Sequence, residues 1–292
     1  MKKQFNKGLL LTSLGSFWWG FIGVLYFQYV SFIGHIELVV HRCLWTAVML
    51  LITTSFLKKW KIFSKIASNK KNLVALFLSG LLIFVNWSVW IYAVATERII
   101  DASFGYFIMP IISVLLGYFF LKERLNKKKL LSVILVLISI LILIFFNLKS
   151  LPWIGLIVAL SWAFYNLVRK KIKVDTDIGL LIESLYIFPF ALITFYIIAK
   201  NGLNDFNLSN PEFSLFLILA GPMTVIPLFL YVRGVELIGL GATGMIFYIT
   251  PTLQFILGYF YYNEEFSYIK FISFIIIWIA VAIYLKDLYE KN

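Results

Sequence analysis

The sequence predicts an all-α integral membrane protein with ten transmembrane helices arranged as two inverted five-helix repeats. Composition predicts the class: 62% of the 292 residues are hydrophobic and 14% are charged, whereas soluble domains have about 45–50% and about 25%. Ten apolar runs predict the number of helices, and an internal repeat predicts their arrangement. The net charge of +12 does not indicate a nucleic-acid partner, because the basic residues separate apolar runs and form no single face or arm.

The apolar runs are long enough to cross a bilayer, which takes about 20 apolar residues in a helix. They predict spans at residues 9–29, 36–57, 73–95, 102–121, 130–147, 152–168, 178–199, 213–235, 240–262 and 269–285. These spans use up most of the chain, so we expect no separate soluble domain. The first run is followed by no small-residue cleavage site, so a cleaved secretory signal is not expected.

The distribution of Lys and Arg predicts the orientation of the chain. Basic residues gather at the N-terminus and in the even-numbered connections, such as KKWKIFSKIASNKKN (58–72) and KERLNKKK (122–129). Loops rich in Lys and Arg stay on the cytoplasmic side of a membrane. The pattern therefore predicts that both termini lie in the cytoplasm.

Two stretches of the chain repeat each other. YFIMPIISVLLGYFFLKER (106–124) matches FYITPTLQFILGYFYYNEE (247–265), so that Pro110 meets Pro251 and Glu123 meets Glu264. The same offset pairs LFLSG (76–80) with LILAG (217–221). The match predicts one repeat at 1–147, a second at 151–286, and a short cytoplasmic tail at 287–292. Five spans are an odd number, so the second repeat enters the membrane from the opposite side, as in alternating-access transporters with a midplane solute site.

Motifs in five of the spans carry a resemblance to a known family. They are HR in the second span, NW (Asn86, Trp87) in the third, ASFGYFIMP in the fourth, FYNLVRKKI in the sixth and YITPTL in the ninth. The whole chain resembles the RarD branch of the EamA-type proteins in the drug/metabolite transporter (DMT) superfamily. The resemblance implies a multi-pass carrier of the bacterial inner membrane. It does not give the substrate: the branch carries a label of chloramphenicol sensitivity, and wider relatives move amino acids, nucleotide-type metabolites and cations.

Ionisable residues inside the spans are candidates for a solute site. A charge at the centre of a span costs about 2.5–3.5 kcal/mol on insertion scales, so it faces a cavity or a partner. Arg42 is a candidate for binding a carboxylate or phosphate of the solute through two parallel hydrogen bonds. An internal ion pair with Glu37 or Glu183 is the alternative. Glu37 is a candidate for proton coupling, or a carboxylate stabilised by the N-terminus of its helix.

His41 falls on Glu183 when the second spans of the two repeats are aligned with a one-residue adjustment. Two titratable groups at one depth suit a proton-coupled carrier, since imidazole titrates near neutral pH. A buried neutral histidine, and a structural pair of Glu183 with Arg42, are the alternatives. Asn86 is expected to bond either the substrate or a neighbouring helix.

Aromatic residues and prolines complete the predicted site. Trp87, Tyr106 and Tyr248 are candidates for lining a cavity and stacking on a substrate, although interfacial belts also take many aromatic residues. The same holds for Trp18, Trp19, Trp90, Phe107 and Phe247. Pro110 and Pro251 stand at matched positions and are candidates for hinges. The alternative is that each proline only sets the shape of its helix.

Several chemistries are not expected. The single cysteine, Cys43, excludes an internal disulfide and a thiolate cluster, and the two histidines are too far apart to bind one metal as helical neighbours. The sequence holds no phosphate-binding G-x-x-x-x-G-K-[ST] loop, no H-E-x-x-H and no G-x-S-x-G. We therefore predict no enzyme activity, no catalytic residue, no metal and no cofactor.

These patterns predict a gradient-driven secondary transporter. Its partners are the lipid bilayer and a small polar or amphipathic metabolite, such as an amino-acid or nucleotide-type solute, and a homodimer is left open. Arg42 binds an anionic group, His41 and Glu183 carry the coupling proton or bind a cationic group, and Asn86 with the tyrosines orients the solute. A drug-efflux permease, a membrane scaffold or sensor, and an intramembrane enzyme acting on lipids are the rival interpretations.

Overall fold

The computed structural model describes residues 2–30, 32–96, 99–147, 153–207, 209, 211–261 and 268–290. Every regular element in these ranges is a helix, which confirms the predicted all-α class. The helices are α1 (Lys2–Phe17), the π-helical turn η1 (Trp18–Ile22), α2 (Gly23–Tyr29), α3 (His35–Phe56), α4 (Trp60–Ala67), α5 (Lys70–Ala95), α6 (Ile99–Leu121), α7 (Lys127–Asn147), α8 (Trp153–Ile172), α9 (Thr176–Lys200), α10 (Pro211–Ile238), α11 (Leu240–Ile246), α12 (Ile249–Phe260) and α13 (Tyr268–Glu290).

Eight described segments are long and apolar enough to cross a membrane: Lys3–Tyr29, His35–Phe56, Lys70–Ala93, Lys127–Phe146, Thr176–Lys200, Pro211–Ile238, Leu240–Leu257 and Phe271–Glu290. The described part of α6 adds a shorter apolar helix, Gly105–Leu121. α8 stands outside this set, and its last turn carries Arg169, Lys170 and Lys171. The last helix runs on to Glu290, into the predicted tail. Glu264, the predicted repeat mate of Glu123, lies outside the described residues.

The predicted span 240–262 is not one continuous helix. α11 ends at Ile246 and α12 begins at Ile249. The cause is Pro251, which has no N–H to donate to the carbonyl four residues earlier. That carbonyl, on Phe247, accepts a hydrogen bond from the Thr250 amide at 2.9 Å instead. The tightened turn separates the two short helices.

The predicted polar connection 58–72 contains a helix that the sequence analysis did not predict. In α4, Ile66 is buried while Lys61 and Lys65 are exposed, so one apolar face holds the helix against the bundle. Just before it, Lys59 Nζ lies 2.7 Å from Asp177 Oδ2. The connection is thereby tied to the start of α9.

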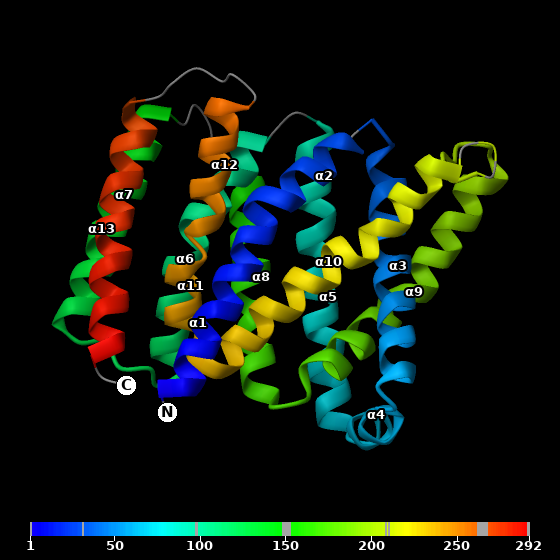
Figure 1. The fold of residues 1–292 in the computed structure, drawn as a ribbon, viewed down its shortest axis with the longest axis horizontal. Coiled ribbons are helices and arrows are strands. Elements are labelled where there is room, and N and C mark those ends of the chain that lie inside the picture. Colours follow the sequence, from blue (N-terminus) through cyan, green and yellow to red (C-terminus); the bar gives the residue numbers. More distant parts are fainter. Residues whose placement is uncertain are drawn as a thin grey trace.

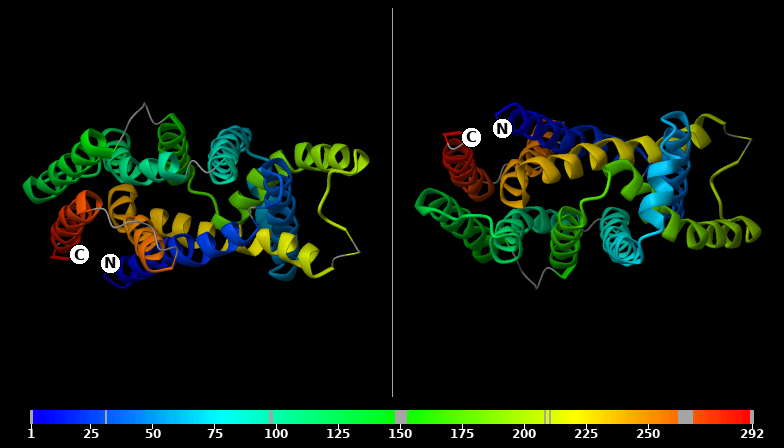
Figure 2. Two further views of the ribbon diagram at one scale, coloured as in Figure 1. Left: turned by 90° about the horizontal axis from the view of Figure 1, so that it is seen from above. Right: turned by 90° about the horizontal axis from the view of Figure 1, so that it is seen from below.

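The helices form two layers (Figure 2). One layer contains α5, α6, α7 and α8, and the other contains α1, α2, α10, α11, α12 and α13. Each layer therefore mixes the two halves of the chain: α1 packs along α10, and α8 packs along α5 and α6. Across the layers α7 packs on α13 and α6 packs on α11, and α3 packs on α9. Both termini lie at the same end of the bundle as α4 (Figure 1).

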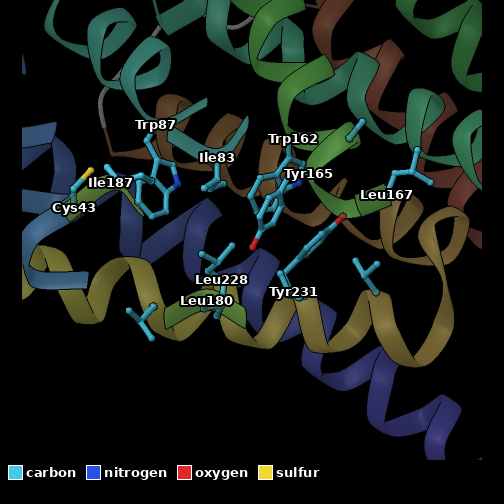
Figure 3. Packing of buried hydrophobic residues seen from close by; sticks show 14 of the residues in the cluster. Cys43, Ile83, Trp87, Trp162, Tyr165, Leu167, Leu180, Ile187, Leu228 and Tyr231 are labelled. Carbon is cyan, nitrogen blue, oxygen red and sulfur yellow. The ribbon is translucent and has the colours of Figure 1, made fainter. Parts of the chain in front are cut away.

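The main core lies where the layers meet. Trp87 from α5, Trp162 and Tyr165 from α8, and Tyr231 from α10 point into it (Figure 3). Among the described residues, glycine is required where α10 crosses α3, because a Cβ added to Gly221 would lie 2.5 Å from the Trp45 carbonyl oxygen. This close contact fixes the position of α3, which carries three of the predicted site residues.

Candidate functional site

A cavity opens between the two layers, with about 580 Å³ of free space including the part that is open to the outside. Its wall comes from η1, α2, α3, α5, α6, α8 and the turn after α11. The lining residues are Trp19, Gly23, Phe27, Arg42, Asn86, Trp87, Trp90, Tyr106, Met109, Val158, Trp162 and Phe247. Four of the six predicted substrate-binding residues are among them: Arg42, Asn86, Trp87 and Tyr106. His41 and Tyr248 are not.

The π-helical turn η1 places Trp19 on the cavity wall. Such turns are rare and occur frequently at functional sites. The Trp19 ring packs edge-on to Trp162 at 5.0 Å between centroids and lies 6.2 Å from Phe247. In the sequence Trp19 is only one of several aromatic candidates for lining a cavity, because a π-helical turn leaves no signal in hydropathy.

Arg42 is 5% exposed and has no carboxylate partner among the described residues. Its Nε donates to Thr224 Oγ1 at 3.0 Å. Its guanidinium carbon lies over the rings of Trp87 at 4.7 Å and Phe27 at 4.9 Å. The ion pair with Glu37 or Glu183 that the sequence left open is not formed, because both carboxylates bond elsewhere. Arg42 is therefore a buried cation on the cavity wall.

Asn86 faces the cavity with its amide orientation fixed. Nδ2 donates to the Val158 carbonyl at 2.9 Å and lies 3.1 Å from Ser161 Oγ. A carbonyl can only accept, so the amide nitrogen must point to α8. The bond to a neighbouring helix, one of the two predicted uses of Asn86, is present. The other use, contact with a solute, is left to its oxygen Oδ1.

Glu183 lies in a polar network away from the cavity lining, between α5, α8 and α9. Its carboxylate accepts hydrogen bonds from Ser79 Oγ at 2.5 Å and Tyr165 OH at 3.2 Å. Arg169 Nη1 lies 3.5 Å from it, and Arg169 Nη2 donates to the Thr176 carbonyl at 3.0 Å. Both charged side chains are buried. The predicted alternative, a structural pair with Arg42, is wrong: the partner is Arg169, which lies in the motif FYNLVRKKI and was not predicted as a site residue.

Gly179 makes room for this ion pair, and we expect Gly179→Ala to destabilise the protein. An added Cβ would overlap the Arg169 guanidinium. The guanidinium is enclosed by protein, so it would have to move and lose its bond to Glu183. Gly34→Ala is a matched control, because a Cβ there meets nothing within 4 Å. A thermal unfolding midpoint in detergent should fall for Gly179→Ala and stay near wild type for Gly34→Ala; equal midpoints would contradict the argument.

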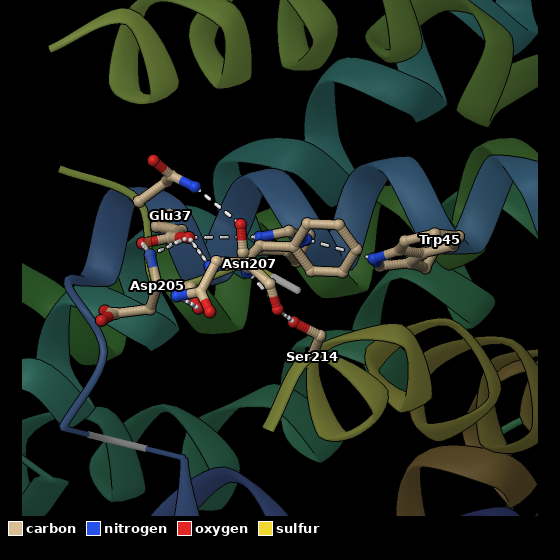
Figure 4. A network of polar contacts seen from close by, with 8 residues as sticks. Glu37, Trp45, Asp205, Asn207 and Ser214 are labelled. Atoms are coloured by element: carbon tan, nitrogen blue, oxygen red, sulfur yellow. Dashed lines mark hydrogen bonds and ion pairs between the residues drawn. The ribbon is translucent and has the colours of Figure 1, made fainter. Parts of the chain in front are cut away.

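Glu37 and His41 belong to a second polar network, in which Glu37 lies beside Asp205 (Figure 4). Neither Glu37 nor His41 is among the residues that line the cavity. Both oxygens of Glu37 accept from the backbone amide of Asp205, at 2.9 and 3.0 Å, and Oε1 also accepts from Phe206 at 3.2 Å. Glu37 Oε1 lies 3.3 Å from His41 Nε2. Partial burial and the negative charge of Glu37 raise the pKa of Asp205. Glu37 thus anchors the connection between α9 and α10.

The proton of His41 can be placed from its partners. Trp45 Nε1 lies 3.1 Å from His41 Nδ1, and an indole N–H can only donate. Nδ1 is therefore the acceptor, and the imidazole proton lies on Nε2, facing Glu37. Both ring nitrogens are therefore engaged, Nδ1 by Trp45 and Nε2 by Glu37.

Removing the Glu37 carboxylate should release the connection that it anchors. In Glu37→Ala we expect the amides of Asp205 and Phe206 to exchange with deuterium about 10- to 100-fold faster, since hydrogen bonds to a charged acceptor are stronger than neutral ones. Exchange mass spectrometry on peptides covering 203–207 measures this. Glu212→Ala, an exposed carboxylate in the first turn of α10, is the control. Equal exchange in both variants would show that Glu37 does not hold the connection.

The two predicted hinge prolines have different surroundings. Pro251 stands beside the break between α11 and α12, whereas Pro110 lies within the continuous helix α6. Tyr248, in that break, is buried and donates from its hydroxyl to the Phe107 carbonyl at 2.8 Å. Tyr248 therefore joins α6 to the break, and it is not among the residues that line the cavity.

The fold and cavity agree with comparisons to known proteins. A family model described as the EamA-like transporter family matches residues 6–145 and again residues 150–286. The chain is 34% identical over 285 residues to Protein RarD of Escherichia coli, covering 98% of this chain and 96% of that one. It is also 34% identical over 282 residues to the uncharacterized transporter YojE of Bacillus subtilis, covering 96% and 93%.

This chain belongs to the EamA-like transporter family, as a RarD-like member. It is a multi-pass membrane transporter by family and by its apolar helices. A solved structure described only as the crystal structure of a protein superposes with a TM-score of 0.72 at 13% identity, covering 96% of this chain and 97% of that one. That likeness shows the fold alone.

Proposed function

We propose that the protein is a gradient-driven secondary transporter of the bacterial inner membrane, with both termini in the cytoplasm. It moves a small amphipathic solute by alternating access through the cavity around Arg42. The observation that carries the proposal is this buried cation, which lacks a carboxylate partner among the described residues. An unpaired buried charge is costly, and a solute anion would compensate it.

The ten-span inverted repeat is part of this proposal. In the repeat α1 corresponds to α8, and α10 corresponds to α5. The packing of α1 on α10 is accordingly matched by the packing of α8 on α5. The matched glycines also make matched contacts. An added Cβ on Gly80 would lie 3.2 Å from the Glu183 carbonyl oxygen on α9, and one on Gly221 would meet the Trp45 carbonyl oxygen on α3. The separate family matches to the two halves support the same duplication.

Coupling is assigned to Glu183 within the proposal. A proton on its carboxylate would remove the charge that holds Arg169, so protonation and opening of the α8–α9 contact would be linked. His41 and Glu37 lie at the other network, where they hold the connection between α9 and α10. Pro110 and Pro251 are assigned as the points where α6 and α12 bend.

Flux into proteoliposomes tests the function. Purified full-length protein would be offered a pooled metabolite mixture under an imposed pH gradient, and mass spectrometry would identify what crosses. We expect an amphipathic anion to accumulate above empty vesicles, with less flux in Arg42→Ala. A folded protein that moves no compound from this pool or from a pool of drugs would favour the scaffold interpretation. Flux of drugs alone would favour the efflux permease.

A further inference from the structure

The cavity contains one formal charge among its described lining residues, and that charge is positive. The nearby carboxylates do not balance it: Glu37 bonds the amides of Asp205 and Phe206, and Glu183 bonds Arg169. A bound solute therefore contacts a single positive charge. One anionic group neutralises that charge, whereas a second anionic group would have no cationic partner.

Aromatic rings surround the Arg42 guanidinium. Its central carbon lies 4.7 Å from the Trp87 centroid, 4.9 Å from Phe27 and 6.0 Å from Trp90. These rings exclude water, which strengthens the attraction between Arg42 and an anion. Nε of Arg42 already donates to Thr224 Oγ1, so the donors of Arg42 that remain for a solute are its two terminal nitrogens. Such a fork matches the two oxygens of a carboxylate.

Asn86 supplies an acceptor in the same cavity. Its nitrogen is engaged by Val158 and Ser161, and no described residue donates to its oxygen Oδ1. An amide oxygen satisfies a neutral N–H or O–H donor. It cannot neutralise a full positive charge as a carboxylate would.

The rest of the wall is shaped for an apolar body. This part of the wall is lined by Trp19, Trp162, Tyr106 and Phe247. The ring pairs here are edge-on or tilted; for example, the planes of Trp19 and Trp162 meet at 83°. A flat ring gains contact area and aromatic attraction among such faces and edges. An ammonium group would find no carboxylate there among the described residues, and Arg42 would repel it.

We infer that the cavity selects an amphipathic monoanion: a carboxylate on a flat or aromatic body that also carries a neutral N–H or O–H donor. Zwitterions, cations and multiply charged nucleotides are selected against. This inference rests on the proposed function in taking the cavity as the solute site. It narrows the solute class that the sequence predicted, because free amino acids and nucleotides both fall outside it.

Four related probes test the charge selection. N-acetyl-L-phenylalanine is the monoanion, L-phenylalanine the zwitterion, L-phenylalaninamide the cation, and N-acetyl-L-phenylalaninamide the neutral compound. Binding to the purified full-length protein at pH 7 is measured by thermal stabilisation and tryptophan fluorescence, and exchange is measured in proteoliposomes. We expect the monoanion to bind about tenfold or more tightly than each of the others. The cation and the neutral compound lack the carboxylate that makes charged hydrogen bonds to Arg42. The zwitterion keeps its carboxylate but brings an ammonium group that finds no carboxylate among the described lining residues.

Two variants separate the site from non-specific effects. Arg42→Gln should bring the affinities for the monoanion and the neutral compound together. Glu290→Gln, in the exposed pair with Lys128, should leave the tenfold preference unchanged. Equal or tighter binding of the zwitterion or the cation would overturn the inference, as would binding of none of the four probes. Monoanion binding without exchange of any solute would uphold the ligand class and overturn the carrier function.

Discussion

Glu183→Gln should lower the free energy of unfolding by about 3–5 kcal/mol, the cost of leaving a buried charge without its partner. Glutamine has the shape of glutamate, so the Ser79 and Tyr165 contacts can remain while Arg169 loses its counter-ion. Arg169 cannot turn to water, since it is 1% exposed. The measurement is the denaturation midpoint of the purified protein in detergent.

Two controls show whether charge causes the loss. Glu290→Gln breaks an ion pair whose side chains are 56% and 48% exposed, and exposed pairs contribute little. The double variant Glu183→Leu with Arg169→Leu should recover much of the stability, because replacing both members with apolar residues removes the uncompensated charge. A Glu183→Gln midpoint no lower than that of Glu290→Gln would contradict the prediction. In flux measurements, unchanged pH dependence in Glu183→Gln would remove Glu183 from coupling.

Arg42→Lys should reduce uptake of an anionic solute at least about tenfold in kcat/KM, because an ammonium group loses the bidentate fork. The lysine also cannot keep both the Thr224 bond and the contacts over Trp87 and Phe27 with the geometry of a planar guanidinium. Initial rates of uptake into proteoliposomes, measured over a range of solute concentrations, give the change.

Arg233→Lys is the matched control for this variant. Arg233 is 43% exposed and pairs locally with Glu236 at 2.6 Å, so the same chemical change is made outside the cavity. Its uptake should stay within about twofold of wild type. If Arg42→Lys also transports at that rate, Arg42 does not bind the solute.

Local patterns in the sequence predicted much of the fold. Hydropathy located the apolar runs, because burial in lipid requires about 20 apolar residues wherever the helix lies. It did not predict α4, whose short amphipathic face is hidden in a lysine-rich connection, or the break before Pro251. The consequences of a proline depend on which carbonyl finds a substitute donor, here the Thr250 amide at Phe247.

Part of the candidate site could also be predicted. Arg42, Asn86, Trp87 and Tyr106 were selected because polar groups and paired motifs inside apolar runs are unusual, and the structure brings all four to one cavity. Thr224 and Arg169 could not be selected in this way, and Trp19 could not be distinguished from the other aromatic candidates. A tryptophan in an aromatic-rich chain, a threonine in a helix and an arginine beside lysines carry no distinguishing local signal.

The sequence by itself determined the class of protein, the apolar segments, the internal repeat and the presence of buried ionisable groups, since each follows from the order of residues along one segment. Only the tertiary structure decided which groups are neutralised and which are free. Thr224 is 182 residues from Arg42, and the Asp205 amide is 168 residues from Glu37. Partners so distant meet only when helices have a fixed rotation and depth, and packing sets both. That packing gives Glu183 an arginine and leaves Arg42 facing the cavity.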